Sequence, residues 1–257
     1  MYNKSTKYIR HCERSEAIHV YKRIFKTGLP RFARNDVKGQ NMAFDFKKEY
    51  KEFYLPPAKP QIVTVPQIQY VAVRGKGNPN VEGGEYKQAV GILYAVSYTL
   101  KMSKMGVHRI DGYFDYVVPP LEGLWWQEHS DSPFDGMNYS DKDSLCWISL
   151  IRLPDFETQA DFDWAVAEAS KKKGLDCSKA ELLKITEGEC VQIMHSGSYD
   201  EEPFSVKMMD VFIAANGYKN DLSASRLHHE IYLSDPRKTS PEKLKTVIRH
   251  PIKRKEK

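Results

Sequence analysis

Cysteine is scarce in this sequence, and long hydrophobic runs are missing. The four cysteines among the 257 residues are Cys12, Cys146, Cys177 and Cys190. They are scattered without a Cys-x-x-Cys pair, so neither a disulfide framework nor a thiolate zinc site is indicated. The longest apolar run, residues 90–96, is far shorter than the ~20 residues of a membrane-spanning helix, and no hydrophobic signal region follows the basic N-terminus. We therefore expect a cytoplasmic protein without a membrane span.

The composition is that of a folded chain. Hydrophobic residues make up 41% and aromatic residues 12%, whereas Gly (15) and Pro (14) are ordinary in number. These values exclude disorder as a description of the whole chain. The length allows one large domain or two small ones, with an ample core.

The net charge of +5 is unevenly distributed. Residues 1–41 carry ten Lys and Arg against three Asp and Glu, and residues 243–257 carry seven against one. The remaining body therefore has a net charge of −8. Basic tails on an acidic body argue against a nucleic-acid groove built into the fold, because phosphate contacts need Lys and Arg on a structured face. An acidic body better suits a neutral or cationic small molecule.

Residues 1–41 differ from the rest of the chain. Residues 11–18 and 28–36 resemble translated intergenic repeat sequence of bacteria, and Met42 begins a more typical start. We expect residues 1–41 to be a disordered extension or one assigned to the protein in error, and residues 42–257 to be the folded part. A genuine basic arm is the alternative, but the segment shows no sustained helical or strand period.

The folded part shows two repeats of strand, helix, strand, strand. In the first repeat, residues 67–74 predict a strand, apolar residues from 86 to 100 predict a helix, and residues 113–118 and 146–153 predict two further strands. A long polar connection separates those two strands. A glycine-rich loop over residues 75–84 precedes the helix, but it lacks the spacing of a phosphate-binding loop.

The second repeat follows the same order. Residues 189–195 predict a strand, residues 204–215 a helix that Gly217 ends, and residues 227–233 and 246–250 two closing strands. Between the repeats, which span about 56–155 and 186–252, Thr158 to Asp161 can cap another helix. The sequence therefore predicts an α+β fold made of two duplicated units.

Four stretches carry a resemblance to a known family. They are Val65–Pro79, Gly83–Tyr86, Val191–Tyr199 and His228–Arg237. Together, residues 56–252 resemble the GyrI-like small-molecule-binding family, which also supplies the effector-binding domain of bacterial transcription activators. No helix-turn-helix is evident in either half, so the regulator branch of the family fits poorly.

The resemblance implies a pseudo-twofold pair of units whose antiparallel sheet forms a concave cavity for drug-like, often aromatic or cationic, molecules. For similar stand-alone members it further implies hydrolysis of cyclopropane-bearing alkylating compounds, a detoxification. Two alternatives stay open: a non-catalytic module that senses or sequesters a drug or effector, and a gyrase-inhibiting interaction protein. Any protein partner is unknown at this point.

Glu230 is the central candidate for chemistry. Strand alternation places His228, Glu230 and Tyr232 on one face, and Leu227, His229, Ile231 and Leu233 on the other, mostly apolar, face. A dry cavity would raise the pKa of Glu230 towards neutrality, as a general base requires. The family's ligand-binding glutamate resembles Glu230 by its place before Ile-Tyr-Leu. From burial statistics alone an exposed strand carboxylate is the plainer interpretation. With the resemblance, a functional role is favoured.

Aromatic side chains on or next to predicted strands are candidate cavity walls. They are Tyr70, Tyr113, Tyr116, Trp125, Trp126, Trp147, Tyr199 and Tyr232. Neighbouring Trp125 and Trp126 cannot face the same way on a strand, so one is expected to pack and one to line the site. Tyr70, Tyr113 or Tyr199 could hydrogen-bond a substrate carbonyl. For any single ring, ordinary core packing is about as probable.

Two further candidates complete the predicted site. His228 shares the face of Glu230, and Asp115 overlays near Glu230 when the repeats are aligned, although a solvated acid is an equal interpretation for Asp115. His228 and His229 lie on opposite strand faces and cannot chelate one metal together. We expect no metal and no cofactor, and no Gly-x-Ser-x-Gly motif or Cys-His pair suggests a covalent nucleophile.

Overall fold

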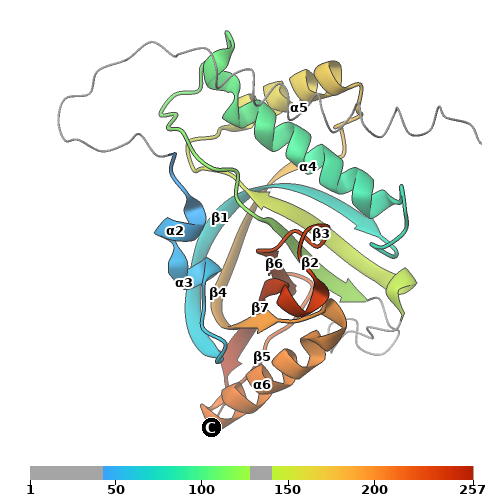
Figure 1. Ribbon diagram of the computed structural model, residues 1–257. Helices are drawn as coiled ribbons and strands as arrows, with labels where there is room; N and C mark the ends of the chain where they lie inside the picture. Colours follow the sequence, from blue (N-terminus) through green and yellow to red (C-terminus); the bar gives the residue numbers. More distant parts are fainter. Residues whose placement is uncertain (1–42, 128–140, 257) are drawn as a thin grey trace, which may run out of the picture. The chain divides into compact units, whose positions relative to one another are not determined.

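The computed structural model describes residues 43–127 and 141–256 (Figure 1). The expectation for residues 1–41 concerns residues outside this part of the chain. The helices of four or more residues are α2 (Phe46–Glu49), α3 (Lys51–Tyr54), α4 (Glu85–Lys101), α5 (Gln159–Lys173) and α6 (Glu202–Ala215). The strands are β1 (Gln61–Lys76), β2 (Leu121–Gln127), β3 (Leu145–Arg152), β4 (Glu181–Ser196), β5 (Tyr218–Asn220), β6 (His228–Tyr232) and β7 (Lys245–Arg254).

The strands form one antiparallel sheet in the order β4-β1-β3-β2-β6-β7-β5. An additional antiparallel pairing of β4 with β7 closes six strands into a barrel and leaves β5 at its side. The order β1-α4-β2-β3 is repeated as β4-α6-β6-β7, with β5 inserted. The α+β class and the duplicated unit are therefore confirmed.

Helices cover the outside of the barrel. Helices α4 and α5 pack on the outer face of the β1-β3-β2 side around Trp147 and Ile151, and α6 packs on β4 and β7 around Ile193 and Ile248 (Figure 1). The alternate side chains of the same strands, such as Leu150, meet inside the barrel with residues of α2 and α3. Two-residue periodicity thus supplies two cores from one set of strands.

Two expectations about strands are wrong. Residues 113–118 form no strand; they contain one bridge, between Tyr116 and Phe44, and precede Pro119 and Pro120. The strand lies at Leu121–Gln127, inside the predicted polar connection, because Glu122 looks solvent-exposed in sequence but is buried. The basic C-terminal stretch is likewise no tail, since ten of its residues form β7.

The cap predicted between the repeats is confirmed. Thr158 and Asp161 form a reciprocal capping box at the start of α5, and Gly174 ends the helix in the left-handed conformation, with φ 62°. Among the described residues, no helix is both long and apolar enough to cross a membrane.

Candidate functional site

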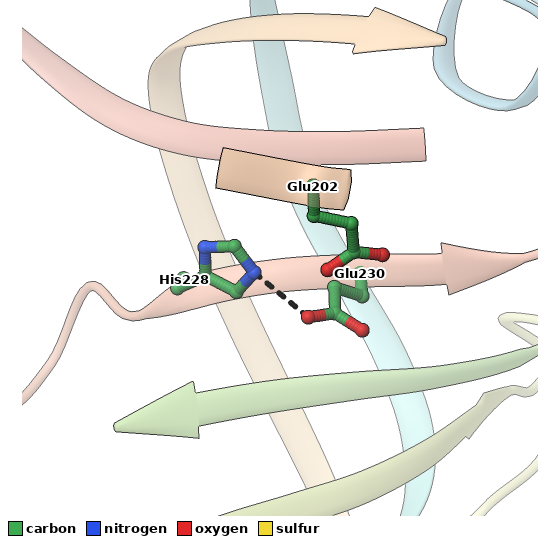
Figure 2. A group of neighbouring side chains, drawn as sticks. All are labelled: Glu202, His228 and Glu230. Carbon is green, nitrogen blue, oxygen red and sulfur yellow. Dashed lines mark hydrogen bonds and ion pairs between the residues drawn. The ribbon is translucent and has the colours of Figure 1, made fainter. Parts of the chain in front are cut away.

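The candidate site lies where β6 meets the start of α6 (Figure 2). His228, Glu230 and Tyr232 point to the same face of β6, as the two-residue period requires. Glu202, the first residue of α6, brings a second carboxyl group to Glu230 from the helix above the strand. The ligand atoms of Glu202, His228 and Glu230 all lie within 4.8 Å of one another.

Hydrogen bonds engage both carboxylate oxygens of Glu230. Nε2 of His228 lies 2.9 Å from Oε1, and the hydroxyl of Tyr232 donates to Oε2 at 2.7 Å. The indole Nε1 of Trp125 donates in turn to the Tyr232 oxygen at 2.8 Å. Glu230 is only 7% exposed, so the carboxylate is fixed in a nearly dry place.

Glu202 is held over Glu230 by the turn between β4 and α6. The ring of His195 bonds Ser205 of α6 at 2.9 Å and donates to the carbonyl oxygen of Ser198 at 3.0 Å. A capping box between Ser198 and Glu201 fixes the same turn. Glu202 itself is 1% exposed, and among the described atoms its Oε1 has no hydrogen-bond partner.

The environment separates the acidities of the two carboxyl groups. Burial, and then the charge of Glu230, raise the pKa of Glu202 well above its usual value. Burial would also raise the pKa of Glu230, but hydrogen bonds from His228, Tyr232 and Glu202 outweigh it and lower that pKa. The upward shift expected for Glu230 is therefore wrong. These opposite pKa shifts predict one proton on the pair near neutral pH, carried by Glu202.

The same three side chains could hold a divalent cation. Two carboxylates and an imidazole nitrogen are suitable ligands for zinc or manganese. Nε2 of His228 already lies at hydrogen-bond distance from Glu230, however, and the raised pKa of Glu202 favours its protonated form. A metal ion would have to displace both protons.

Several predicted site residues gather around Glu230. The rings of Tyr199 and Tyr232 meet edge to face with centroids 5.9 Å apart, and Trp125 contacts Tyr232 as described. Trp125 and Trp126 lie in different clusters on opposite faces of β2, as expected. Trp125 is the one on the side of Glu230, whereas Trp126 packs inside the barrel.

Other predicted site residues lie elsewhere, and those assignments are corrected. Tyr70 is inside the barrel, on the opposite face of the sheet, and Trp147 is fully buried against Gly75 and Tyr86. Neither ring presents a free surface towards Glu230.

The three candidates from residues 113–118 do not lie beside Glu230, because that segment is not a strand. Tyr113 donates its hydroxyl to the carbonyl of Lys101 at 2.6 Å, and Tyr116 is buried in the barrel core. Asp115 pairs with Lys104 at 2.7 Å on the surface, in line with the alternative interpretation of Asp115 as a solvated acid.

A separate pocket of about 610 Å³ opens on the outside of the molecule. It lies over β1, β4 and the start of α5, and its lining includes Gln69, Glu157 and Lys184. None of the residues around Glu230 contributes to it, so it is not the predicted ligand cavity.

Comparisons with known proteins settle the family. The model of the GyrI-like small molecule binding domain matches residues 58–253. The chain belongs to this family. Two solved structures from Listeria innocua are similar to this GyrI-like chain. An uncharacterised conserved protein is 49% identical, covers 82% of this chain and 100% of its own, and has a TM-score of 0.76. A protein described as a hydrolase is 48% identical with the same coverages and a TM-score of 0.74. A comparison with curated proteins found no match.

Two residues beside Glu230 could not be found from the sequence alone. Glu202 stands in a loop-to-helix stretch, and only the capping pattern of Ser198 and Glu201 before Pro203 could have placed it at a helix start. Tyr86 appears in sequence as one apolar position of α4. Its ring lies 5.4 Å from that of Trp125, and Glu230 is among the groups that raise its pKa, after burial as the main cause.

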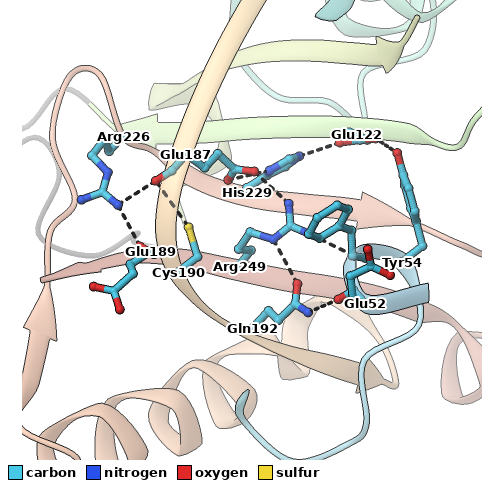
Figure 3. Close-up of polar contacts among 11 residues, drawn as sticks. Glu52, Tyr54, Glu122, Glu187, Glu189, Cys190, Gln192, Arg226, His229 and Arg249 are labelled. Carbon is cyan, nitrogen blue, oxygen red and sulfur yellow. Dashed lines mark hydrogen bonds and ion pairs between the residues drawn. The ribbon is translucent and has the colours of Figure 1, made fainter. Parts of the chain in front are cut away.

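The other face of β6, which alternation described as mostly apolar, carries a buried charged network. His229 points into the barrel between Glu187, at 3.0 Å, and Glu122, at 2.9 Å (Figure 3). Arg249 adds an ion pair to Glu187 at 2.8 Å and bonds Gln192. Although burial opposes it, the charge of Glu187 raises the pKa of His229 to about 9. His229 is therefore a buried histidine with a raised pKa that lies between two glutamates.

Proposed function

We propose that this GyrI-like domain binds planar hydrophobic or cationic small molecules and hydrolyses cyclopropane-bearing electrophiles among them. The observation that carries the proposal is the buried pair of Glu230 and Glu202, whose carboxyl groups lie within 4.8 Å of each other beside three aromatic rings. The pKa of Glu230 is lowered and that of Glu202 is raised, which suits one as a base and the other as an acid. The 48% identity to a protein described as a hydrolase supports a hydrolytic reaction.

In the proposed reaction Glu230 is the general base. Its carboxylate positions a water molecule and takes one proton from it while the water oxygen attacks the strained ring carbon. The bond to that carbon breaks, and its electron pair moves into the conjugated carbonyl of the substrate. The negative charge is attracted by nearby hydroxyl donors, for which Tyr199 is the remaining candidate.

Glu202 completes the proton balance. Its proton is delivered to the oxygen or carbon that has gained the electron pair, so the product is substrate plus one water. The proton that Glu230 took from the water then passes to Glu202. This transfer restores the starting state, in which Glu230 is ionised and Glu202 is protonated. Separate acid and base roles for two carboxyl groups follow from their opposite pKa shifts.

A substitution at the base tests the proposal. Glu230→Gln keeps the shape and polarity of the side chain but removes the proton acceptor. Turnover of a spirocyclopropyl cyclohexadienone should fall by about 10²–10⁴-fold, with affinity changed by less than about five-fold, because aromatic contacts remain. Mass spectrometry measures addition of one water, and quenching of the tryptophan fluorescence measures binding.

Glu242→Gln is the matched control, because this exposed glutamate bonds only Ser240 among the described residues. It should turn over the probe as the unsubstituted protein does. Undiminished hydrolysis in Glu230→Gln would exclude the role of Glu230.

A binding module without chemistry is the second candidate, favoured by the family's description as a small-molecule binding domain. It predicts saturable binding of the same probe, with the probe recovered unchanged by mass spectrometry. The two candidates therefore differ in one measurable product.

A further inference from the structure

A line of three buried side chains leads away from the carboxylate of Glu230. Beyond His228, whose Nε2 faces Glu230 Oε1, the other ring nitrogen of His228, Nδ1, lies 2.6 Å from Nε2 of His250 on β7. The two rings are 4.8 Å apart at 65°, and His250 is 4% exposed. Nδ1 of His250 is buried and has no partner among the described atoms.

The donors along this line can be assigned from hydrogen-bond capacity. An ionised Glu230 only accepts, so Nε2 of His228 carries a proton and donates it. If His228 is uncharged, its Nδ1 accepts from Nε2–H of His250, and the orphaned Nδ1 of His250 is a bare lone pair. If His228 were a cation, an N–H of His250 would instead be buried without an acceptor, which is the costlier arrangement. Burial lowers the pKa of His250 well below its usual value, in keeping with an uncharged His250 ring.

The neighbouring histidine shows the contrast. His229 lies between the carboxylates of Glu122 and Glu187 and is a cation. His228 lies between one carboxylate and one imidazole. The partner at the second nitrogen therefore distinguishes two adjacent histidines on opposite faces of one strand.

We propose that His250 is a positioning residue of the site: by donating Nε2–H to Nδ1 of His228, it fixes His228 as an uncharged donor to Glu230. An uncharged donor orients the carboxylate without adding a positive charge that would weaken it as a base. The catalytic consequence rests on the proposed function, whereas the proton assignment does not.

Other groups face Glu230 and His228 and contribute to any pH profile. They are Glu202 of α6, Tyr86 of α4, Tyr199 before α6, Tyr232 of β6 and Trp125 of β2. The tests below therefore change only the residue at position 250 and keep all of these constant.

Nitrogen NMR of the histidine rings tests the assignment directly. In the unsubstituted protein at about pH 7, His228 should carry its proton on Nε2 alone. His250→Gln places an amide N–H near the position of the histidine Nε2 and should preserve this tautomer. His250→Glu places a carboxylate there, and His228 should become doubly protonated, as His229 is. A doubly protonated His228 in the unsubstituted protein would overturn the proposal. So would a His228 ring whose protonation does not change in His250→Glu.

Kinetics with the spirocyclopropyl probe test the consequence. His250→Gln should keep kcat within about three-fold, whereas His250→Glu should lower kcat by about 10–100-fold and move the acid limb of its pH profile to lower pH. KM should change by less than about two-fold in both, because His228 separates position 250 from Glu230. Equal kcat and equal pH profiles in the two variants would contradict a positioning role.

A histidine far from the site is the control. His108 bonds Asp161 and stacks on Trp164, and His108→Gln should leave kcat and its pH profile unchanged. If the unsubstituted protein shows no turnover, the proposed function fails, yet the NMR assignment still decides the proton position. Melting temperatures of all variants identify any loss of fold.

Discussion

At the scale of residues, Glu202 and Glu230 have the same side chain, but their surroundings shift its pKa in opposite directions. Both are buried, but Glu230 accepts hydrogen bonds from His228 and Tyr232, whereas Glu202 Oε1 has no partner among the described atoms. Desolvation raises the pKa of a carboxyl group, and donors aimed at the charged form lower it. The pair can therefore hold an acid and a base at the same pH.

Glu202→Gln tests the acid role. In the unsubstituted protein kcat should fall at low pH, as Glu230 gains a proton, and at high pH, as Glu202 loses one, because the pKa of Glu230 is lowered and that of Glu202 is raised. Glutamine keeps a donor to Glu230 but has no proton to transfer. The kcat should drop by about 10²–10⁴-fold, and the alkaline limb assigned to Glu202 should disappear. A complete bell-shaped profile in this variant would argue against the assignment.

Sequence reasoning reached part of this site. Strand alternation placed His228, Glu230 and Tyr232 together because the spacing of two residues is local geometry. It could not bring Glu202 and Tyr86 to them, since both contacts depend on how α6 and α4 cross the sheet. It also misjudged the pKa of Glu230, because burial was considered without the three donors that oppose it.

At the scale of elements, two glycines allow the aromatic side chains to lie flat on the strands. A Cβ at Gly75 would lie 2.2 Å from the ring of Trp147. A Cβ at Gly123 would lie 2.6 Å from Nε1 of Trp125 and 3.1 Å from the hydroxyl oxygen of Tyr232. The indole of Trp125 can thus reach Tyr232 only because β2 has no side chain at position 123.

Gly123→Ala should therefore disturb the site through β2. Displacing Trp125 removes its hydrogen bond to Tyr232, the residue that donates to Glu230. The kcat should therefore fall by about 10-fold, and the free energy of unfolding should fall by about 1–3 kcal/mol. Enzyme assays and urea denaturation measure the two effects.

Gly91→Ala is the control for this substitution. A Cβ at Gly91 on α4 meets nothing within 4 Å, and alanine is the better helix former, so stability should rise by about 0.5–1 kcal/mol without loss of turnover. Equal effects of the two substitutions would refute the steric argument.

The elements themselves were only partly predictable. The cap of α5 and the repeated strand and helix order follow from local patterns, and they agree with the structure. Strand β2 was misplaced because the buried partners of its Glu122, His229 and the hydroxyl of Tyr54, are 107 and 68 residues away in sequence. A polar residue with a distant partner looks like a loop residue in sequence.

At the scale of the whole molecule, buried charges join the strands that close the barrel. His229 of β6 bonds Glu122 of β2 and Glu187 of β4, and Arg249 of β7 bonds Glu187 and the carbonyl oxygen of Phe53 in α3 (Figure 3). Removing one member of such a network leaves an unpaired buried charge and destabilises a protein by about 3–5 kcal/mol.

This network predicts a pH dependence of stability. The pKa of His229 is about 9 in the folded state, against 6.5 for an unperturbed histidine. The stabilisation is therefore fully present below about pH 6.5 and is lost as the pH rises through about 9, by up to about 3 kcal/mol. Urea denaturation should show a steeper alkaline loss of stability in the unsubstituted protein than in His229→Gln. Parallel pH curves for the two proteins would contradict a charged His229.

The central claim is that one proton is shared by Glu202 and Glu230, and infrared spectroscopy of buried carboxyl groups tests it most directly. Burial raises the pKa of Glu157 to about 8, so Glu157→Gln provides a background without that protonated group. In this background at about pH 7, we predict a protonated carboxyl band that Glu202→Gln removes. Glu230→Gln should weaken the same band, because the negative charge that raises the pKa of Glu202 is gone. A spectrum in which Glu202→Gln removes no protonated band would contradict the account.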